Sequence, residues 1–292
     1  MGTFLRQCPP IIVALIVGAP LVFADAPKGY YDLAYGKKGP ELREQIHTII
    51  DGHKVIPYTV SGNTNWFDGQ DMDVWEALAY TDSVCAPEYP DCGIIKLLYL
   101  DEYRHVSQAN RGDSKNDSWD REHVWPKSRG FPNQNQVGYT DLHHLRPADR
   151  NLNGAHSNYG YDNGGEPVID KRNDGSEILI EARLNTNEAS FEPPNRAKGQ
   201  VARILFYMAI RYEEGDNGAD ELMPDLVLKD TNSKVNEPWI GDLCTLLEWH
   251  NQYGPTNFER QRNDKVMEIQ GNRNPFIDEP GWANLIWQDQ CE

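Results

Sequence analysis

Hydrophobic side chains recur every three or four residues in five stretches of the chain, and this spacing predicts amphipathic helices. In the first stretch, Leu42, Ile46 and Ile50 share one face. The last begins at Thr256, which Glu259 follows three residues later, as in a capping box, and Gly271 is its expected C-terminal cap. The predicted helices cover residues 40–53, 71–81, 194–214, 238–253 and 256–270.

The longest of these helices also carries charge. Arg203 and Arg211 lie eight positions apart, which places them on nearly the same face of residues 194–214. The pattern alone predicts that they are solvated, as most arginines are.

Strand signals are short and scattered. Residues 177–183 (EILIEAR) alternate, and the turn-forming residues 170–175 precede them, which predicts a hairpin. The apolar run 94–100 fits either a buried strand or one side of a helix. We expect a short strand at 141–145, followed by a helix that Pro147 can start and that places Asn153 about two turns in. The mixture of helices and short strands predicts an α+β fold. No repeat or linker divides the chain, so we expect one helix-rich domain over residues 25–292.

The N-terminus has the pattern of an export signal. Arg6 precedes a 14-residue apolar run at 11–24, which is too short to span a bilayer, and small residues follow. We expect cleavage after Ala24, with cleavage after Ala26 or an uncleaved anchor as alternatives. No later stretch predicts a membrane helix. The protein is therefore expected in the periplasm or outside the cell.

The cysteine count supports an oxidising compartment. Without Cys8 of the signal, four cysteines remain, and four allow three pairings. The turn-rich segment CAPEYPDC favours Cys85–Cys92, which leaves Cys244–Cys291 to tie the C-terminus to a helix. A metal site is the alternative, but the chain has no C-x-x-C motif.

Candidate chemistry is concentrated at residues 121–158. Glu122 and His123 are adjacent, and Asn153 lies thirty residues after His123. Histidine can accept a proton from water near neutral pH, and carboxylate and amide oxygens suit a hard divalent cation. These residue types predict a phosphodiesterase site with one metal ion.

The overall charge argues against a protein that binds nucleic acid through a basic surface. The formal net charge is -17, whereas nucleic-acid binding usually requires a basic surface. Residues 120–150 are close to neutral, with five Lys/Arg against four Asp/Glu. We therefore expect weak substrate affinity that depends on short-range phosphate contacts and a divalent ion.

Four motifs in order, REHVWPKS, TDLHHLRPADRNLN, NRAKGQVARILFYMAIRYE and IQGNRNPFID, resemble the endonuclease I family of periplasmic or secreted nucleases. The resemblance covers roughly residues 74–287. It implies a ββα-metal (His-Me finger) motif, with His123 as general base and with Glu122 and Asn153 as metal ligands. It also implies Mg²⁺, or another divalent cation, and cleavage of double- and single-stranded DNA, and of RNA as a further substrate, to 5′-phosphate products.

The resemblance leaves other residues with weaker assignments. Arg146 and Arg121 are candidates for contacting the scissile phosphate or the product. His143 and His144 are expected to support the site, one facing the core and the other solvent. The family commonly has arginine where this chain has His156, so a phosphate contact there would become pH-dependent.

Two other functions are compatible with the residues. One is a phosphodiesterase acting on small nucleotides. The other is a non-catalytic binder of zinc or nucleic acid that uses the histidines. We expect a monomer that does not bind membranes.

Overall fold

The computed structural model describes residues 26–60, 72–85, 92–100, 102–112, 115–215, 222–233 and 236–291. The predicted signal peptide, residues 1–24, lies outside these ranges. In the described part of the chain, no helix has the length and apolar character that crossing a bilayer requires.

Eight α-helices form in the described residues, and the predicted helices are among them. The periodic stretches become α1, α2, α4, α5 and α6, and α6 has both the Thr256–Glu259 capping box and a left-handed Gly271 at its end. The helices are α1 Gly39–Ile50, α2 Val74–Thr81, α3 Arg150–His156, α4 Asn195–Arg211, α5 Leu243–Gln252, α6 Asn257–Gln270, α7 Pro275–Asp278 and α8 Trp282–Trp287.

The strands form small separate sheets. Three sheets have two strands each, β1 with β2, β3 with β4, and β9 with β10, and the fourth has the order β5-β8-β7-β6. The predicted hairpin is β6–β7, and the run at 94–100 contributes strand β1. The strands are β1 Ile94–Lys96, β2 Tyr103–His105, β3 Trp119–His123, β4 Leu145–Asp149, β5 Gly160–Tyr161, β6 Glu166–Lys171, β7 Glu177–Asn185, β8 Ser190–Glu192, β9 Val227–Leu228 and β10 Trp239–Ile240. Three short 3₁₀ turns, η1 Val106–Gln108, η2 Val137–Thr140 and η3 Gln288–Gln290, complete the described elements.

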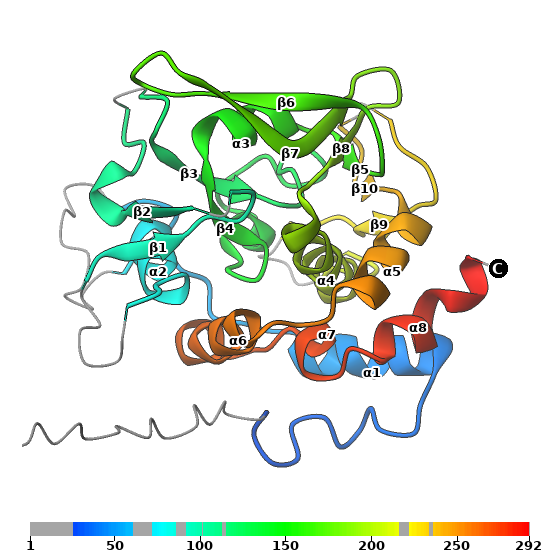
Figure 1. Cartoon of the computed structure of the whole chain (residues 1–292). Helices are drawn as coiled ribbons and strands as arrows, with labels where there is room; N and C mark the ends of the chain where they lie inside the picture. Colours follow the sequence, from blue (N-terminus) through cyan, green and yellow to red (C-terminus); the bar gives the residue numbers. More distant parts are fainter. Residues whose placement is uncertain are drawn as a thin grey trace, which may run out of the picture.

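Helix α4 runs through the middle of the molecule. In Figure 1 it lies between the strand-rich half, which holds β3, β4, α3 and the four-stranded sheet, and a layer formed by α1, α6, α7 and α8. Every residue from 197 to 211 is buried. The mixture of helices and mainly antiparallel strands confirms the α+β class.

The two arginines of α4 are buried, so the prediction that they are solvated is wrong. Arg203 pairs with Glu259 at 2.7 Å, and Arg211 pairs with Asp51 at 2.7 Å. Burial is tolerable because each guanidinium faces a carboxylate. The helix is therefore buried all round, although its sequence pattern is amphipathic.

The strand predicted at 141–145 is wrong in position. The chain turns over residues 141–144, and β4 passes through Pro147. Proline lacks an N–H, but each strand of a two-stranded sheet has an outer edge where that donor is not needed. Helix α3 begins only after Asp149, which caps it, so Asn153 lies in the first turn instead of two turns in.

The helix predicted at 238–253 begins later than expected. Trp239 and Ile240 form β10, which pairs in parallel with β9. Helix α5 then begins at Leu243, because Asp242 accepts a hydrogen bond from the Thr245 N–H and caps its first turn.

Both expected disulfides are present. Cys85–Cys92 closes a local loop, and Cys244–Cys291 joins α5 to the C-terminal residues.

Candidate active site

A pocket of about 540 Å³ lies where β3 meets α3. It brings together Glu122, His123, Asn153 and Arg121, four of the residues that the sequence singled out. His123 is the last residue of β3, and the chain bends directly after it. Both side chains of the Glu122–His123 pair line this pocket, although neighbours along a strand point to opposite faces. The other lining residues are Tyr58, Trp75, Asn110, Asp120, Pro126, Lys127, Ser128, Ser157, Asn158 and Asn236.

His123 is held as a neutral base. Its Nε2 lies 3.0 Å from the carbonyl oxygen of Tyr139, and a carbonyl only accepts hydrogen bonds, so Nε2 carries the proton. The lone pair is then on Nδ1. Burial lowers the pKa of His123 well below its ordinary value, and His144 acts in the same direction. The ring is therefore neutral at neutral pH, and its Nδ1 can accept a proton.

Glu122 has one occupied and one open carboxylate oxygen. Its Oε1 lies 2.9 Å from the Tyr99 hydroxyl, which donates to it, and 2.6 Å from His156 Nδ1. Oε2 has no hydrogen-bond donor in the described part of the chain. The carboxylate is thus fixed through one oxygen, and the other is available in the pocket.

Asn153 reaches the pocket from the first turn of α3. Its amide nitrogen donates to Asp120 Oδ2 at 3.4 Å, and Asp120 Oδ1 accepts from Asn110 at 2.8 Å. This contact leaves the Asn153 Oδ1 without a donor among the described residues. Burial raises the pKa of Asp120, and the two amides oppose that shift. The amide oxygen of Asn153 is the second open hard oxygen in the pocket.

These oxygens fit a hard divalent cation. Glu122 Oε2 and Asn153 Oδ1 are ligand types that Mg²⁺ prefers, and Mg²⁺ commonly binds through one or two protein oxygens while keeping several waters. The described residues contain no cluster of three or more His, Cys, Asp and Glu side chains that could enclose a metal. Two protein oxygens would leave coordination positions on such an ion for water and substrate.

Two cationic side chains line the pocket. Arg121 lies over the ring of Tyr58, 3.4 Å from its centroid, and over that of Trp75 at 4.1 Å, and it also donates to the Tyr58 carbonyl. Lys127 is exposed and donates to the Tyr139 hydroxyl at 2.7 Å. Both cations are thus held near His123.

Arg146 lies elsewhere. It is 2 % exposed, donates to Asp82 at 2.8 Å and to Gln200 at 3.1 Å, and is absent from the pocket lining. Asp82 satisfies the charge of this guanidinium inside the core. The structure therefore does not bring Arg146 to the place where a phosphate contact would be made.

His156 is also buried away from solvent. Its ring stacks on Tyr161 and binds Glu122, so it does not line the pocket. The sequence suggested a phosphate contact for this position, but the geometry gives it a different partner.

His143 and His144 are both buried, so the expectation that one faces solvent is wrong. His143 Nε2 lies 3.2 Å from the Asn272 carbonyl, and His144 Nε2 lies 2.7 Å from the Gly138 carbonyl. His144 Nδ1 has no partner among the described residues. His144 helps to hold the loop whose Tyr139 carbonyl orients His123.

We expect these two histidines to make the fold sensitive to acid. Burial lowers each pKa to about 4, whereas an unfolded histidine has a pKa of about 6.5. The unfolded chain therefore binds protons first, and the stabilisation present above pH 6.5 is lost as the pH falls towards 4. Each histidine should contribute a slope on the order of 1 kcal/mol per pH unit.

Urea unfolding between pH 7 and pH 4.5 measures this effect. The variant His144→Gln, whose amide can still donate to Gly138, should show a shallower slope than the wild type. Comparing the two slopes cancels the contributions of other titrating groups. Equal slopes would mean that His144 does not contribute.

Several pocket residues carry no signal in the sequence. Tyr58 comes from a segment far from the central stretch, Asn110 lies eleven residues before Arg121 in a segment without a recognised motif, and Trp75 is expected from its helical spacing to face the core. Lys127 lies in the motif REHVWPKS, which by itself indicates no role for this lysine. Asp120 lies two positions before Glu122, and residues two apart in a strand point to the same face. This spacing is the one pattern that could have identified a further pocket carboxylate.

Comparison with known proteins identifies the family of this chain. The family model for endonuclease I matches residues 38–281. An extracellular ribonuclease of Bacillus subtilis is 40% identical over 261 residues, which cover 88% of this chain and 78% of that protein. The extracellular ribonuclease of Bacillus amyloliquefaciens is 40% identical over 259 residues, with the same coverage. A periplasmic deoxyribonuclease of Aeromonas hydrophila is 24% identical over 208 residues, 69% of this chain and 75% of that protein. The chain therefore belongs to the endonuclease I family and is a nuclease, a hydrolase of phosphodiester bonds.

Proposed function

We propose that this protein is an exported, sequence-nonspecific endonuclease that cuts DNA and RNA to 5′-phosphate products. It would use His123 as general base and one divalent cation, Mg²⁺, held by Glu122 and Asn153 in a ββα-metal arrangement of β3, β4 and α3. We further propose that residues 1–24 are its cleaved signal peptide and that the rest forms one monomeric domain.

One observation carries the proposal: a fixed neutral histidine and two open hard oxygens line the same pocket. Residues thirty positions apart meet there because α3 follows β4 directly and packs against β3. Cavities with a few convergent polar groups of this kind are the usual sites of chemistry.

His123 would act on water. Nδ1 takes the proton as the water oxygen attacks phosphorus, and the bond from phosphorus to the 3′ oxygen breaks. The departing 3′ oxygen takes a proton from solvent water, which leaves a 5′-phosphate and a 3′-hydroxyl. The cation would neutralise charge on the phosphate and stabilise the departing oxygen. Arg121 and Lys127 line the same pocket and can bind non-bridging or flanking phosphate oxygens. Arg146 has no part in this scheme.

The pocket and the relatives both support a nucleic-acid substrate. The two relatives of 40% identity are named ribonucleases, and the more distant Aeromonas protein is named a deoxyribonuclease. Two pocket cations in a chain of net charge -17 predict weak, short-range binding without long-range attraction. The zinc-binding alternative loses support because His143 and His144 each face a backbone carbonyl in the core.

Metal removal provides the test. The mature protein should convert closed circular DNA to nicked and linear forms, and should degrade a single-stranded RNA, in the presence of Mg²⁺. EDTA should abolish both reactions, and excess Mg²⁺ should restore them. Release of small-nucleotide products with no internal cut in circular DNA would support the phosphodiesterase alternative instead.

A further inference from the structure

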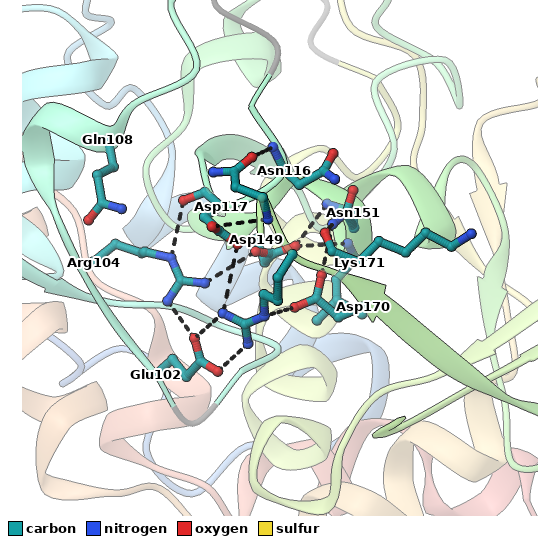
Figure 2. A network of polar contacts seen from close by, with 12 residues as sticks. Glu102, Arg104, Gln108, Asn116, Asp117, Asp149, Asn151, Asp170 and Lys171 are labelled. Atoms are coloured by element: carbon teal, nitrogen blue, oxygen red, sulfur yellow. Dashed lines mark hydrogen bonds and ion pairs between the residues drawn. The ribbon is translucent and has the colours of Figure 1, made fainter. Parts of the chain in front are cut away.

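A largely buried network of charged side chains lies where β3 and α3 begin (Figure 2). Two carboxylates, Asp149 and Asp170, are fully buried. Arg172 Nε lies 2.7 Å from Asp170 Oδ2, and its terminal nitrogens donate to Glu102. Arg104 donates to Glu102 as well and reaches Asp149 Oδ2 at 3.4 Å. We refer to these five residues as the ion-pair network.

The network makes hydrogen bonds to the first residues of α3. Asp149 accepts hydrogen bonds from the N–H groups of Asn151 and Leu152, which makes it the N-cap of the helix. The Asn151 side chain donates to Asp170 Oδ1 at 2.8 Å and to the Lys171 carbonyl at 2.7 Å. Helix α3 is thereby tied to the end of β6 by side-chain bonds.

The same network also contacts the residues at the start of β3. Arg104 donates to the carbonyl of Asp117, two residues before the strand. Asp149 lies opposite Trp119 in the β3–β4 pairing, and the Arg150 N–H donates to the Ser118 carbonyl at 3.1 Å. Strand β3 and helix α3 are therefore joined at one point, and Figure 2 shows the contacts converging there.

From that joint the two proposed metal ligands lie a short way along separate elements. Glu122 is three residues beyond Trp119, about 10 Å along a strand, and Asn153 is four residues beyond Asp149, about 6 Å along a helix. A small rotation of α3 about the joint would change the separation of the two oxygens.

The contact between the starts of β3 and α3 is held by charged side chains and not by apolar packing. The two arginines face four carboxylates when Asp117 is included, which lies 4.0 Å from Arg172, so the formal sum is 2 − 4 = −2. Apolar residues in such a place are often as stabilising as buried ion pairs, but they fix orientation less strictly than directional bonds. The arginines hold the pKa of Glu102 down at about 2, whereas burial and Asp170 raise that of Asp149 to about 6.

We infer that the ion-pair network is a positioning device, which sets the separation of Glu122 and Asn153 and so the affinity of the pocket for its divalent cation. The inference rests on the proposed function. Outer residues that orient metal ligands commonly change metal affinity about tenfold or more when they are replaced.

Two variants loosen the joint without removing a buried charge. Asn151→Ala deletes the amide that ties α3 to Asp170 and Lys171, and alanine suits a helix. Arg172→Lys keeps the positive charge beside Asp170 but loses the planar fork that donates to both oxygens of Glu102. Arg203→Lys is the matched control, since Arg203 also pairs with a carboxylate, Glu259, but lies deeper in the core, in α4 and outside the pocket lining.

Binding of Mn²⁺ to the mature protein without substrate, followed by electron paramagnetic resonance of the free ion, gives the first measurement. The Mg²⁺ concentration for half-maximal cleavage and the melting temperature give the second and third. Asn151→Ala and Arg172→Lys should weaken Mn²⁺ binding about tenfold, and saturating Mg²⁺ should restore most of the cleavage rate. Arg203→Lys should lower the melting temperature and leave Mn²⁺ affinity unchanged.

The inference is overturned if both loosened variants bind Mn²⁺ within twofold of the wild type, or if Arg203→Lys weakens binding as much as they do. If Arg172→Lys does not fold, Asn151→Ala decides the outcome alone. A wild-type protein that neither binds the ion nor cuts nucleic acid would refute the proposed function itself, which separates the two failures.

Discussion

Replacing His123 with alanine should lower the rate of cleavage at saturating Mg²⁺ by about 10² to 10⁴, the usual contribution of a general base. The structure gives the reason. Tyr139 fixes Nε2 as the protonated nitrogen, so Nδ1 is the base in the pocket, and alanine offers none. Substrate binding should change little, because the pocket cations are Arg121 and Lys127. The loss should therefore appear in kcat and leave KM nearly unchanged.

A second histidine and a small base distinguish catalysis from damage to the fold. His105 is exposed on β2 and does not line the pocket, so His105→Ala should keep the wild-type rate. Added imidazole can enter the space left in His123→Ala and should restore part of its activity. Wild-type cleavage by His123→Ala, measured on circular DNA and on RNA, would show that another group removes the proton.

The central residues of the site could be predicted because they lie in short motifs. Glu122 and His123 are adjacent, and Asn153 lies in a second motif thirty residues on, which belongs to the same β3–β4–α3 unit. Tyr58 and Asn110 could not be found in this way, since they reach the pocket through tertiary packing. Their contacts, such as that of Asn110 with Asp120, become visible only in three dimensions.

The arginines show the same limit for charge. Arg146 occurs within a motif of polar and basic residues, which suggested a phosphate contact, but its partner is Asp82, 64 positions away. Arg203 and Arg211 have a periodicity that fits a solvated face, yet both guanidinium groups are buried, and they pair with Glu259 and with the half-exposed Asp51. Periodicity records where charges lie along a helix. It contains no information on which distant carboxylate will meet them.

Backbone elements were predictable where local interactions decide them. The Thr256–Glu259 capping box and Gly271 fix α6 at both ends, and the bounds predicted for that helix are nearly those observed. The β4–α3 boundary was misplaced because proline is compatible with two local structures. Pairing of Pro147 with Arg121 across the sheet made it a strand residue, and Asp149 then became the helix cap.

Glu122→Gln should have the other large effect. Glu122 supplies the charged oxygen of the proposed metal pair, and a neutral amide of the same length removes that charge while the side chain still fits between Tyr99 and His156. Because the attraction of a hard cation depends on this charge, we expect the Mg²⁺ concentration for half-maximal cleavage to rise by about 100-fold. A titration of cleavage rate against Mg²⁺ measures the change, with Mn²⁺ binding as an independent record.

Two further variants identify the cause of that change. Tyr99→Phe removes one hydrogen bond to Glu122 Oε1 and leaves the charge, so it should shift the Mg²⁺ midpoint far less than Glu122→Gln does. Asn153→Ala removes the neutral ligand and should fall between the two, because a half-buried amide on the first turn of α3 contributes an oxygen but no charge.

If Glu122→Gln keeps the wild-type midpoint, the carboxylate does not bind the ion. If Asn153→Ala alone keeps it, the second ligand is another pocket oxygen, and Asp120, which already contacts Asn153, is the next residue to replace.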